Sequence, residues 1–317
     1  MARSGSHAVV VIALIANLCI TASKFVAAAF TGSAAIASEG VHSLADTANE
    51  LLLLYGLRRA GAPADRRHPF GHGREAYFWS FIVALLILIV GASVSFYQGL
   101  RRLESPHPLT NVAAIYAVLV ISFVVEGISW LTALKRIREA KGELGYYAAF
   151  RRSKDPGVFT VLLEDSAALL GIAIAFAGTL LTHVTGQTAF DAAASIAIAA
   201  LLCATSFLLA RETKELLIGE PAQPELQRSI LGIAGADECV ARANGVVTVQ
   251  LGPDHVFAGL SMAFDDALSA PAIECCVERL ESAIRARHPE VVAVYVKPQR
   301  PEVWNERRRF LEESGDD

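Results

Sequence analysis

Six apolar segments, each about 20 residues long, set what this chain can fold into, because a helix of that length crosses the hydrocarbon core of a bilayer. The 317 residues are 53% hydrophobic, above the range of about 45–50% that soluble domains show. The segments are Ala8–Phe30, Ala35–Leu57, Tyr77–Leu100, Asn111–Leu134, Gly157–His183 and Phe190–Leu209. We therefore expect an α-helical polytopic membrane protein with six transmembrane helices in a domain over residues 1–210.

The connections between these segments differ in charge. The second-to-third connection carries Arg58, Arg59, Arg66, Arg67 and Arg74, and the fourth-to-fifth carries Lys135, Arg136, Arg138, Lys141, Arg151, Arg152 and Lys154. The first-to-second and fifth-to-sixth connections carry neither lysine nor arginine. Because basic loops stay in the cytoplasm, we expect a multi-pass protein of the bacterial inner membrane with both termini cytoplasmic.

The character of the chain changes after Gly219. Residues 211–223 are expected to form a linker, and residues 224–300 a small α+β domain on the cytoplasmic side. Its expected elements, in chain order, are a helix over Pro224–Ala234, strands over Val246–Leu251 and Val256–Phe264, a helix over Ser269–Arg287 and a strand over Val291–Val296. Residues 301–317 show no clear apolar pattern and are expected to form a mobile tail.

A polar stripe runs along the second apolar segment. Glu39, His42, Asp46 and Glu50 follow one another at offsets of three and four residues, which places them on one face of a helix. Ionisable residues inside a membrane are costly and mark functional sites. His42 and Asp46, one turn apart, offer a nitrogen and an oxygen to one divalent cation.

The polar stripe and an acid on another helix are expected at similar depths in the membrane. At 1.5 Å per residue, Asp46 lies roughly 16 Å from the cytoplasmic end of its helix, and Asp165 in the fifth segment lies roughly 12 Å from the same side. Two carboxylates on different helices therefore reach similar depths, where one cation would neutralise them together. The alternative interpretation is an intramembrane hydrogen-bond network with Lys24 or Glu126.

The basic connection after the second segment holds another candidate site. Asp65, His68 and His72 lie within eight residues, and Gly71 and Gly73 permit the tight turns that would bring the three side chains together. The spacing by itself is a weak signal, since loop histidines are usually only solvated. We consider it a possible second metal site.

The cysteines predict no further metal site. Cys19, Cys203, Cys239, Cys275 and Cys276 form no CxxC pair, and we interpret them as reduced, packed thiols rather than as disulfides or a zinc cluster. The adjacent pair Cys275–Cys276 is better explained by helix packing than by metal binding.

Several motifs resemble the cation diffusion facilitator family of divalent-metal transporters. They are TGSAAIASEGVHSLADTANELLLLYGL, HPFGHGREAYFWSFIVALLI, ISFVVEGISW, LLEDSAALLG and LESAIRARHPEV, and the HPFGHGREAYFWS run is similar to the zinc transporter 9-like branch. The resemblance covers nearly the whole chain. It implies six membrane helices, a cytoplasmic ferredoxin-like domain, assembly as a homodimer, and export of Zn²⁺ or a similar ion in exchange for protons.

The resemblance also implies ligands for the transported ion. His42 and Asp46 match the family's pair on the second helix, and Asp165 matches the second member of the pair on the fifth. The first member of that pair falls on Val161, which has no ligand atom. Glu164 lies only about 60° around the helix from Val161, and we hypothesise that it supplies the missing ligand.

The same comparison bears on the loop and on the terminal domain. Asp65, His68 and His72 have the spacing at which some family members bind a second zinc. A terminal-domain metal cluster is not expected, because His255 and His288 are isolated. That domain is expected to dimerise rather than to sense metal.

The expected partners are divalent cations and protons as cargo, the lipid bilayer and a second copy of the chain, with no nucleic acid and no resident cofactor. No HExxH motif of an intramembrane metalloprotease occurs, and we expect no enzyme activity. Two alternatives remain, namely a transporter of Mn²⁺, Fe²⁺ or Co²⁺ and a metal channel not coupled to protons.

Overall fold

The computed structural model describes residues 3–140, 145, 154 and 156–313. Lys141, Arg151 and Arg152 of the basic connection, and residues 314–317 of the expected tail, lie outside the described residues. The chain divides into two compact units. We call residues 1–58 and 76–214 the helical unit, and residues 59–75 and 215–317 the sheet unit.

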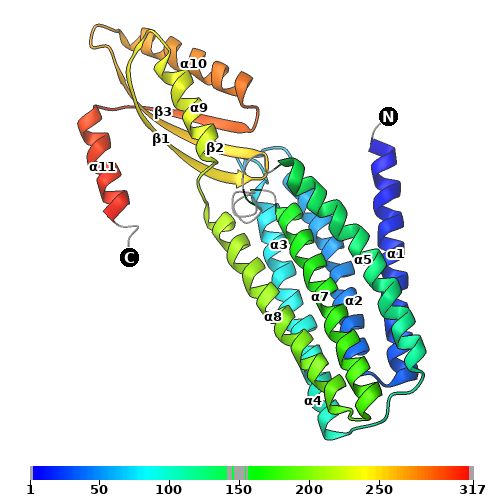
Figure 1. The fold of residues 1–317 in the computed structure, drawn as a ribbon. Helices are drawn as coiled ribbons and strands as arrows, with labels where there is room; N and C mark the ends of the chain where they lie inside the picture. Colours follow the sequence, from blue (N-terminus) through cyan, green and yellow to red (C-terminus); the bar gives the residue numbers. More distant parts are fainter. Residues whose placement is uncertain (1–2, 141–144, 146–153, 155, 314–317) are drawn as a thin grey trace. The chain divides into compact units, whose positions relative to one another are not determined.

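All six predicted apolar segments are helical (Figure 1). In chain order the helices are α1 (Arg3–Thr31), α2 (Ala34–Ala60), α3 (Arg74–Leu86), α4 (Ser93–Glu104), α5 (Val112–Ala140), α7 (Pro156–Thr185) and α8 (Ala189–Ile218). A short π-helix, η1 (Ile87–Ala92), joins α3 to α4, so the third segment is one continuous helical rod with a widened turn.

Within the described residues, four of these helical segments are long and apolar enough to cross a membrane. They cover Arg74–Glu104, Val112–Lys135, Thr160–Thr185 and Ala189–Ile218. Large apolar side chains on the rods point outward, which is unfavourable in water but suits lipid; examples are Phe96, Ile121, Leu131, Leu170 and Phe207. The fold is therefore that of a multi-pass integral membrane protein with a small terminal sheet.

The start of α2 is fixed by Asp191, at the first turn of α8. One carboxylate oxygen of Asp191 accepts the backbone N–H of Ala34 at 2.8 Å, and the other accepts the hydroxyl of Ser33 at 2.5 Å. Arg102 forms an ion pair with the same carboxylate at 3.2 Å, and both side chains are buried. Asp191 thus satisfies the free N–H groups at the helix start and holds α2, which carries the polar stripe, against α8.

The sheet unit follows the predicted order of helices and strands. Its elements are α9 (Pro224–Gly235), β1 (Val240–Gly252), β2 (His255–Phe264), α10 (Ala270–Arg287) and β3 (Val291–Pro298). The strand order is β1-β2-β3, with β1 antiparallel and β3 parallel to β2. Strand β1 begins six residues earlier than predicted, because irregular pairing with β2 continues back to Val240.

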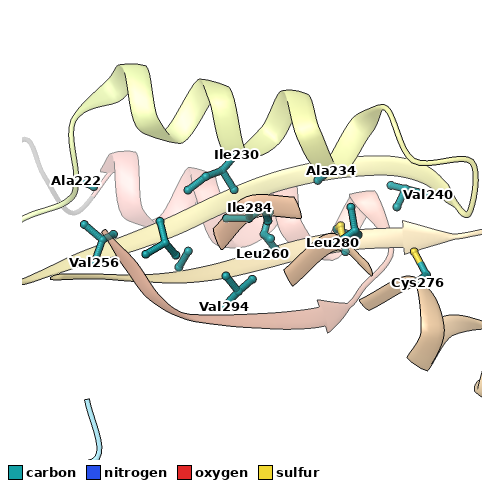
Figure 2. Packing of buried hydrophobic residues seen from close by; sticks show 13 residues of the cluster. Ala222, Ile230, Ala234, Val240, Val256, Leu260, Cys276, Leu280, Ile284 and Val294 are labelled. Carbon is teal, nitrogen blue, oxygen red and sulfur yellow. The ribbon is translucent and has the colours of Figure 1, made fainter. Parts of the chain in front are cut away.

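One face of this sheet forms the apolar core of the unit (Figure 2). Alternate residues of β2, among them Val256 and Leu260, pack with Ile230 of α9 and with Leu280 and Ile284 of α10. Burial on alternate positions is what a strand with one covered face requires. Both helices therefore share a single core with the sheet.

The opposite face carries Phe257 and Tyr295, whose rings lie 5.2 Å apart. Helix α11 (Pro301–Glu313) packs against β1 and β2, with the indole of Trp304 directly over Gly245. The segment that we expected to be a mobile tail is therefore helical through Glu313. Any side chain larger than hydrogen at Gly245 would meet that indole ring.

Candidate metal centres

His42 and Asp46 face each other along α2. The Nδ1 atom of His42 lies 3.4 Å from the Oδ1 atom of Asp46. Neither ring nitrogen of His42, and not this oxygen of Asp46, has a hydrogen-bond partner among the described residues, although all three atoms are buried. Buried polar atoms without partners are rare and call for an explanation, and a bound cation would provide one for all three.

A small cavity opens beside Asp46. It has a volume of about 30 Å³, enough for one or two water molecules or a single ion. Its lining comes from α1, α2, α5 and α7, namely Asn17, Ile20, Ser43, Asp46, Glu50, Val125, Glu126, Ser129 and Asp165. Four carboxylates thus surround one small space, and the sequence analysis assigned only Asp46 and Asp165 to it.

The two adjacent acids of α7, Glu164 and Asp165, have different surroundings. Asp165 lines the cavity and accepts a hydrogen bond from the Ser129 hydroxyl of α5 at 2.8 Å. Glu164 is buried and accepts a hydrogen bond from the Asn49 amide of α2 at 2.8 Å. Glu164 is not part of the cavity lining, and the half-buried Val161 lies one turn before Asp165. Glu164 is therefore placed to position α2, and its hypothesised role as a ligand stays a prediction.

Lys24 of α1 belongs to a separate polar pair beside this cavity. Its ammonium group donates to Glu39 at 3.2 Å and to the Ser43 hydroxyl at 2.7 Å, and the charged pair is fully buried. About two turns further along the same helices, the Asn17 side-chain amide donates to Glu50 at 2.9 Å. The alternative of a hydrogen-bond network therefore describes Lys24 and Glu39, whereas Glu126 lines the cavity with Asp46.

The side chains of the three loop residues lie close together, as their spacing predicted. The ligand atoms of Asp65, His68 and His72 all lie within 4.8 Å of one another. One oxygen of Asp65 lies 3.3 Å from Nδ1 of His68, and the other lies 3.2 Å from Nε2 of His72. Gly71 takes a φ of 85°, a left-handed conformation that favours glycine. His42, Asp46, Glu164 and Asp165, by contrast, do not form such a group within the described part of the chain.

Backbone hydrogen bonds stabilise the ionised form of the Asp65 carboxylate. The N–H groups of His68 and Arg67 donate to the same oxygen of Asp65, each at 2.7 Å. Together with His72 they lower the pKa of Asp65 to about 2. The carboxylate is therefore ionised at any physiological pH, as a metal ligand must be.

Aromatic and backbone contacts attach this loop to the sheet of its own unit. The ring of Phe70 lies 5.7 Å from that of Phe257 on β2 and 6.4 Å from that of Tyr295 on β3. The backbone of Gly73 lies so close to the β1–β2 turn that a Cβ would come within 2.6 Å of the carbonyl oxygen of Leu251. The loop site is thus built on the terminal sheet, a relation that the sequence analysis did not predict.

Long apolar helices around a buried, acid-lined cavity define a multi-pass membrane protein with a candidate cation site. The family model described as the cation efflux transmembrane domain matches residues 10–218. The chain belongs to this family, which confirms the resemblance drawn from its motifs.

Relatives with assigned names extend the comparison. The chain is 34% identical over 268 residues to the "Proton-coupled zinc antiporter SLC30A9, mitochondrial" of Xenopus laevis, an alignment that covers 84% of this chain and 48% of the relative. The Homo sapiens protein of the same name is also 34% identical, over 82% of this chain and 46% of the relative. The "Manganese efflux system protein MneP" of Bacillus subtilis (strain 168) is 28% identical, over 70% and 71%. The chain spans about half the length of the antiporters it matches.

Proposed function

We propose that this chain carries a divalent metal cation, preferentially Zn²⁺, out of the cytoplasm in exchange for protons, and that it is not an enzyme. The observation that carries the proposal is the set of unpartnered buried atoms on His42 and Asp46, beside a cavity that Asp165 also lines. Nitrogen and carboxylate ligands without thiolates hold Zn²⁺ and also let it leave. The names of the antiporter relatives agree with this cargo.

Proton exchange follows from the same ligands. A histidine binds metal only when neutral and a carboxylate only when ionised, so metal entry displaces protons and proton entry displaces metal. Further carboxylates in the cavity, Glu50 and Glu126, can take protons without being ligands themselves. His42, whose side-chain type titrates nearest neutrality, is proposed as the main coupling group.

The proposal includes the arrangement around this site. Six helices would span the membrane, with α1 and α2 added to the four apolar rods and with both termini in the cytoplasm. Residues 1–210 would form the membrane domain and 224–300 a ferredoxin-like domain that pairs two copies of the chain. Of the expected linker 211–223, residues up to Ile218 continue helix α8, so only the residues after Ile218 would act as a linker. The loop residues Asp65, His68 and His72 would hold a second ion. The animal relatives are named as mitochondrial, so the comparisons do not favour a bacterial inner membrane over an organellar one.

Manganese is the second candidate for the cargo. The cavity lining is rich in carboxylates and contains no histidine, and Val161 offers no ligand where a histidine or aspartate would add one. Oxygen-rich sites suit Mn²⁺ better than Zn²⁺, and one bacterial relative is named as a manganese efflux protein. Iron and cobalt ions are compatible with the same ligands.

Metal-driven proton flux in proteoliposomes tests the proposal. Purified wild type, Asp46→Asn and the control Glu104→Gln, an exposed acid at the end of α4, would each receive Zn²⁺, Mn²⁺, Fe²⁺ or Co²⁺ in turn. We expect zinc-driven proton flux in wild type and control, and its loss in Asp46→Asn. Metal uptake without proton movement would indicate a channel, and zinc-driven flux retained in Asp46→Asn would refute the site.

The contribution of Glu164 needs its own comparison. Glu164→Ala and Asp165→Ala remove neighbouring carboxylates from the same helix turn, so each serves as the control for the other. If Glu164 is a ligand, both variants lose transport. Normal transport by Glu164→Ala, together with an inactive Asp165→Ala, would show that Glu164 only holds Asn49.

A further inference from the structure

A second group of soft and hard metal ligands lies in the sheet unit, away from the loop site. Asp237 precedes β1, Cys239 is the next residue but one, and Cys276 lies on α10. One ligand atom from each of the three lies within 4.8 Å of the others. Asp237 and Cys276 are 39 residues apart in the chain, so only the packing of α10 on the sheet brings them together.

Hydrogen bonds connect the three side chains, and Arg279 supplies a positive charge to two of them, Asp237 and Cys239. The guanidinium group of Arg279, one turn after Cys276 on α10, binds both oxygens of Asp237 at 2.7 and 2.8 Å. The same Nη2 atom lies 3.5 Å from the sulfur of Cys239. The thiol of Cys276 donates to Asp237 at 3.4 Å. A positive charge therefore already bridges the carboxylate and one of the two sulfurs.

We propose that Asp237, Cys239 and Cys276 form a binding site for a thiophilic divalent cation, Zn²⁺ or Cd²⁺, from which Arg279 withdraws when the ion binds. Two thiolates and a carboxylate are a ligand set that Zn²⁺ accepts, with water in the fourth tetrahedral position. The side chain of Arg279 is 53% exposed, so it can leave without opening the core. In this proposal Arg279 competes with the metal for Asp237.

The site differs in chemistry from the proposed transport and loop sites. Those sites offer nitrogen and oxygen, whereas sulfur selects softer ions and holds them more tightly. The proposal also replaces our expectation from the sequence that the cysteines are only packed thiols and that the terminal domain carries no metal cluster. It does not depend on transport, because the ligands all belong to the sheet unit.

Cobalt binding to the full chain in detergent, under reducing conditions, tests the proposal. Co²⁺ bound by thiolate gives a charge-transfer absorption in the near ultraviolet that nitrogen and oxygen ligands do not give. We expect this absorption in wild type, displacement of Co²⁺ by Zn²⁺, and affinity lower by at least about a hundredfold in Cys276→Ser and Cys239→Ser. Cys239 is only half-buried, so its variant keeps the test valid if Cys276→Ser does not fold.

Two controls sharpen the result. Cys275→Ser changes the neighbouring, exposed cysteine and is expected to keep the wild-type absorption. Arg279→Gln removes the competing cation and is expected to raise the affinity for Co²⁺ by about tenfold, the size of a lost charge-assisted hydrogen bond. No charge-transfer absorption at saturating Co²⁺, an unchanged absorption in the Cys239→Ser Cys276→Ser double variant, or weaker binding in Arg279→Gln would each overturn the proposal. Because absorption is read without transport, failure here is distinct from failure of the proposed function.

Discussion

Two buried polar side chains of the helical unit, Asp191 and His42, differ in how fully they are hydrogen-bonded. The carboxylate of Asp191 accepts hydrogen bonds at both oxygens and forms an ion pair with Arg102. The ring nitrogens of His42 have no hydrogen-bond partner among the residues that the structure describes. Complete pairing inside a protein holds structure together, whereas unpaired atoms are kept at a cost to stability and are typical of sites that act on a ligand.

The Arg102–Asp191 pair predicts a loss of stability on substitution. Arg102→Met leaves the Asp191 carboxylate buried with an uncompensated charge, which costs about 3–5 kcal/mol. Arg101→Met changes the neighbouring, exposed arginine and is expected to cost little. Thermal unfolding of the two variants in detergent measures the difference. Equal midpoints would mean that the buried pair contributes nothing to stability.

The adjacent cysteines of α10 predict a difference in reactivity. Burial and the neighbouring Asp237 raise the pKa of Cys276 to about 12, so without metal the group stays a protonated thiol at neutral pH, and the thiolate is the form that reacts. The side chain of Cys275 is exposed. Alkylation followed by mass spectrometry at pH 7 should modify Cys275 first, and modification of Cys276 should accelerate only as the pH rises toward 12. Equal rates at pH 7 would contradict this account.

Helix packing at the scale of whole elements depends on small residues at particular positions. Gly171 of α7 lies against the carboxylate of Glu39 on α2, the partner of Lys24, and a Cβ there would overlap an oxygen of that carboxylate. Close approach of helices at glycine is common in membrane proteins. The polar pair and the glycine are therefore parts of one contact between α2 and α7.

Two glycine substitutions of opposite expected sign test this contact. Gly171→Ala should displace Glu39, lower the thermal stability and weaken metal binding at the neighbouring cavity. Gly127→Ala on α5 meets nothing within 4 Å and should stabilise the helix slightly, since alanine favours helix by about 1 kcal/mol over glycine. The thermal unfolding midpoint and the zinc affinity of each variant, compared with wild type, test both expectations. A Gly171→Ala variant as stable as Gly127→Ala would show that the contact is not tight.

The sequence predicted the helices and strands better than it predicted which side chains of different elements meet. Apolar length marked all six helical segments, and alternation marked the strands, because each signal is local. Asp65, His68 and His72 were predicted as a group since their spacing alone can bring them together. Glu50, Glu126 and Ser129 were not assigned to the cavity, because a helix pattern does not say which residues of different helices meet. The proximity of the Cys239 and Cys276 sulfurs depends on how α10 packs on the sheet, and it was missed for the same reason.

At the scale of the whole molecule, the number of membrane crossings sets where the ends of the chain lie. Six crossings, with α1 and α2 counted among them, put the two termini on the same side. A small tag at either end should then be equally accessible to protease in sealed inside-out vesicles and protected in right-side-out ones. Tags that respond oppositely would require an odd number of crossings and would remove one helix from the proposed domain.

Residues 59–75 fold with the terminal sheet although they join two helices of the other unit. The chain therefore passes between its two units three times, after Arg58, after Glu75 and after Lys214. A gene cut once near Lys214 would not separate two independent modules, since the sheet would lose Phe70 and its neighbours. Exchanging the terminal domain between relatives would thus require transplanting residues 59–75 and 215–317 together. In a chimera that received only residues 215–317, the loop over residues 59–75 would come from one protein and the sheet it packs on from the other.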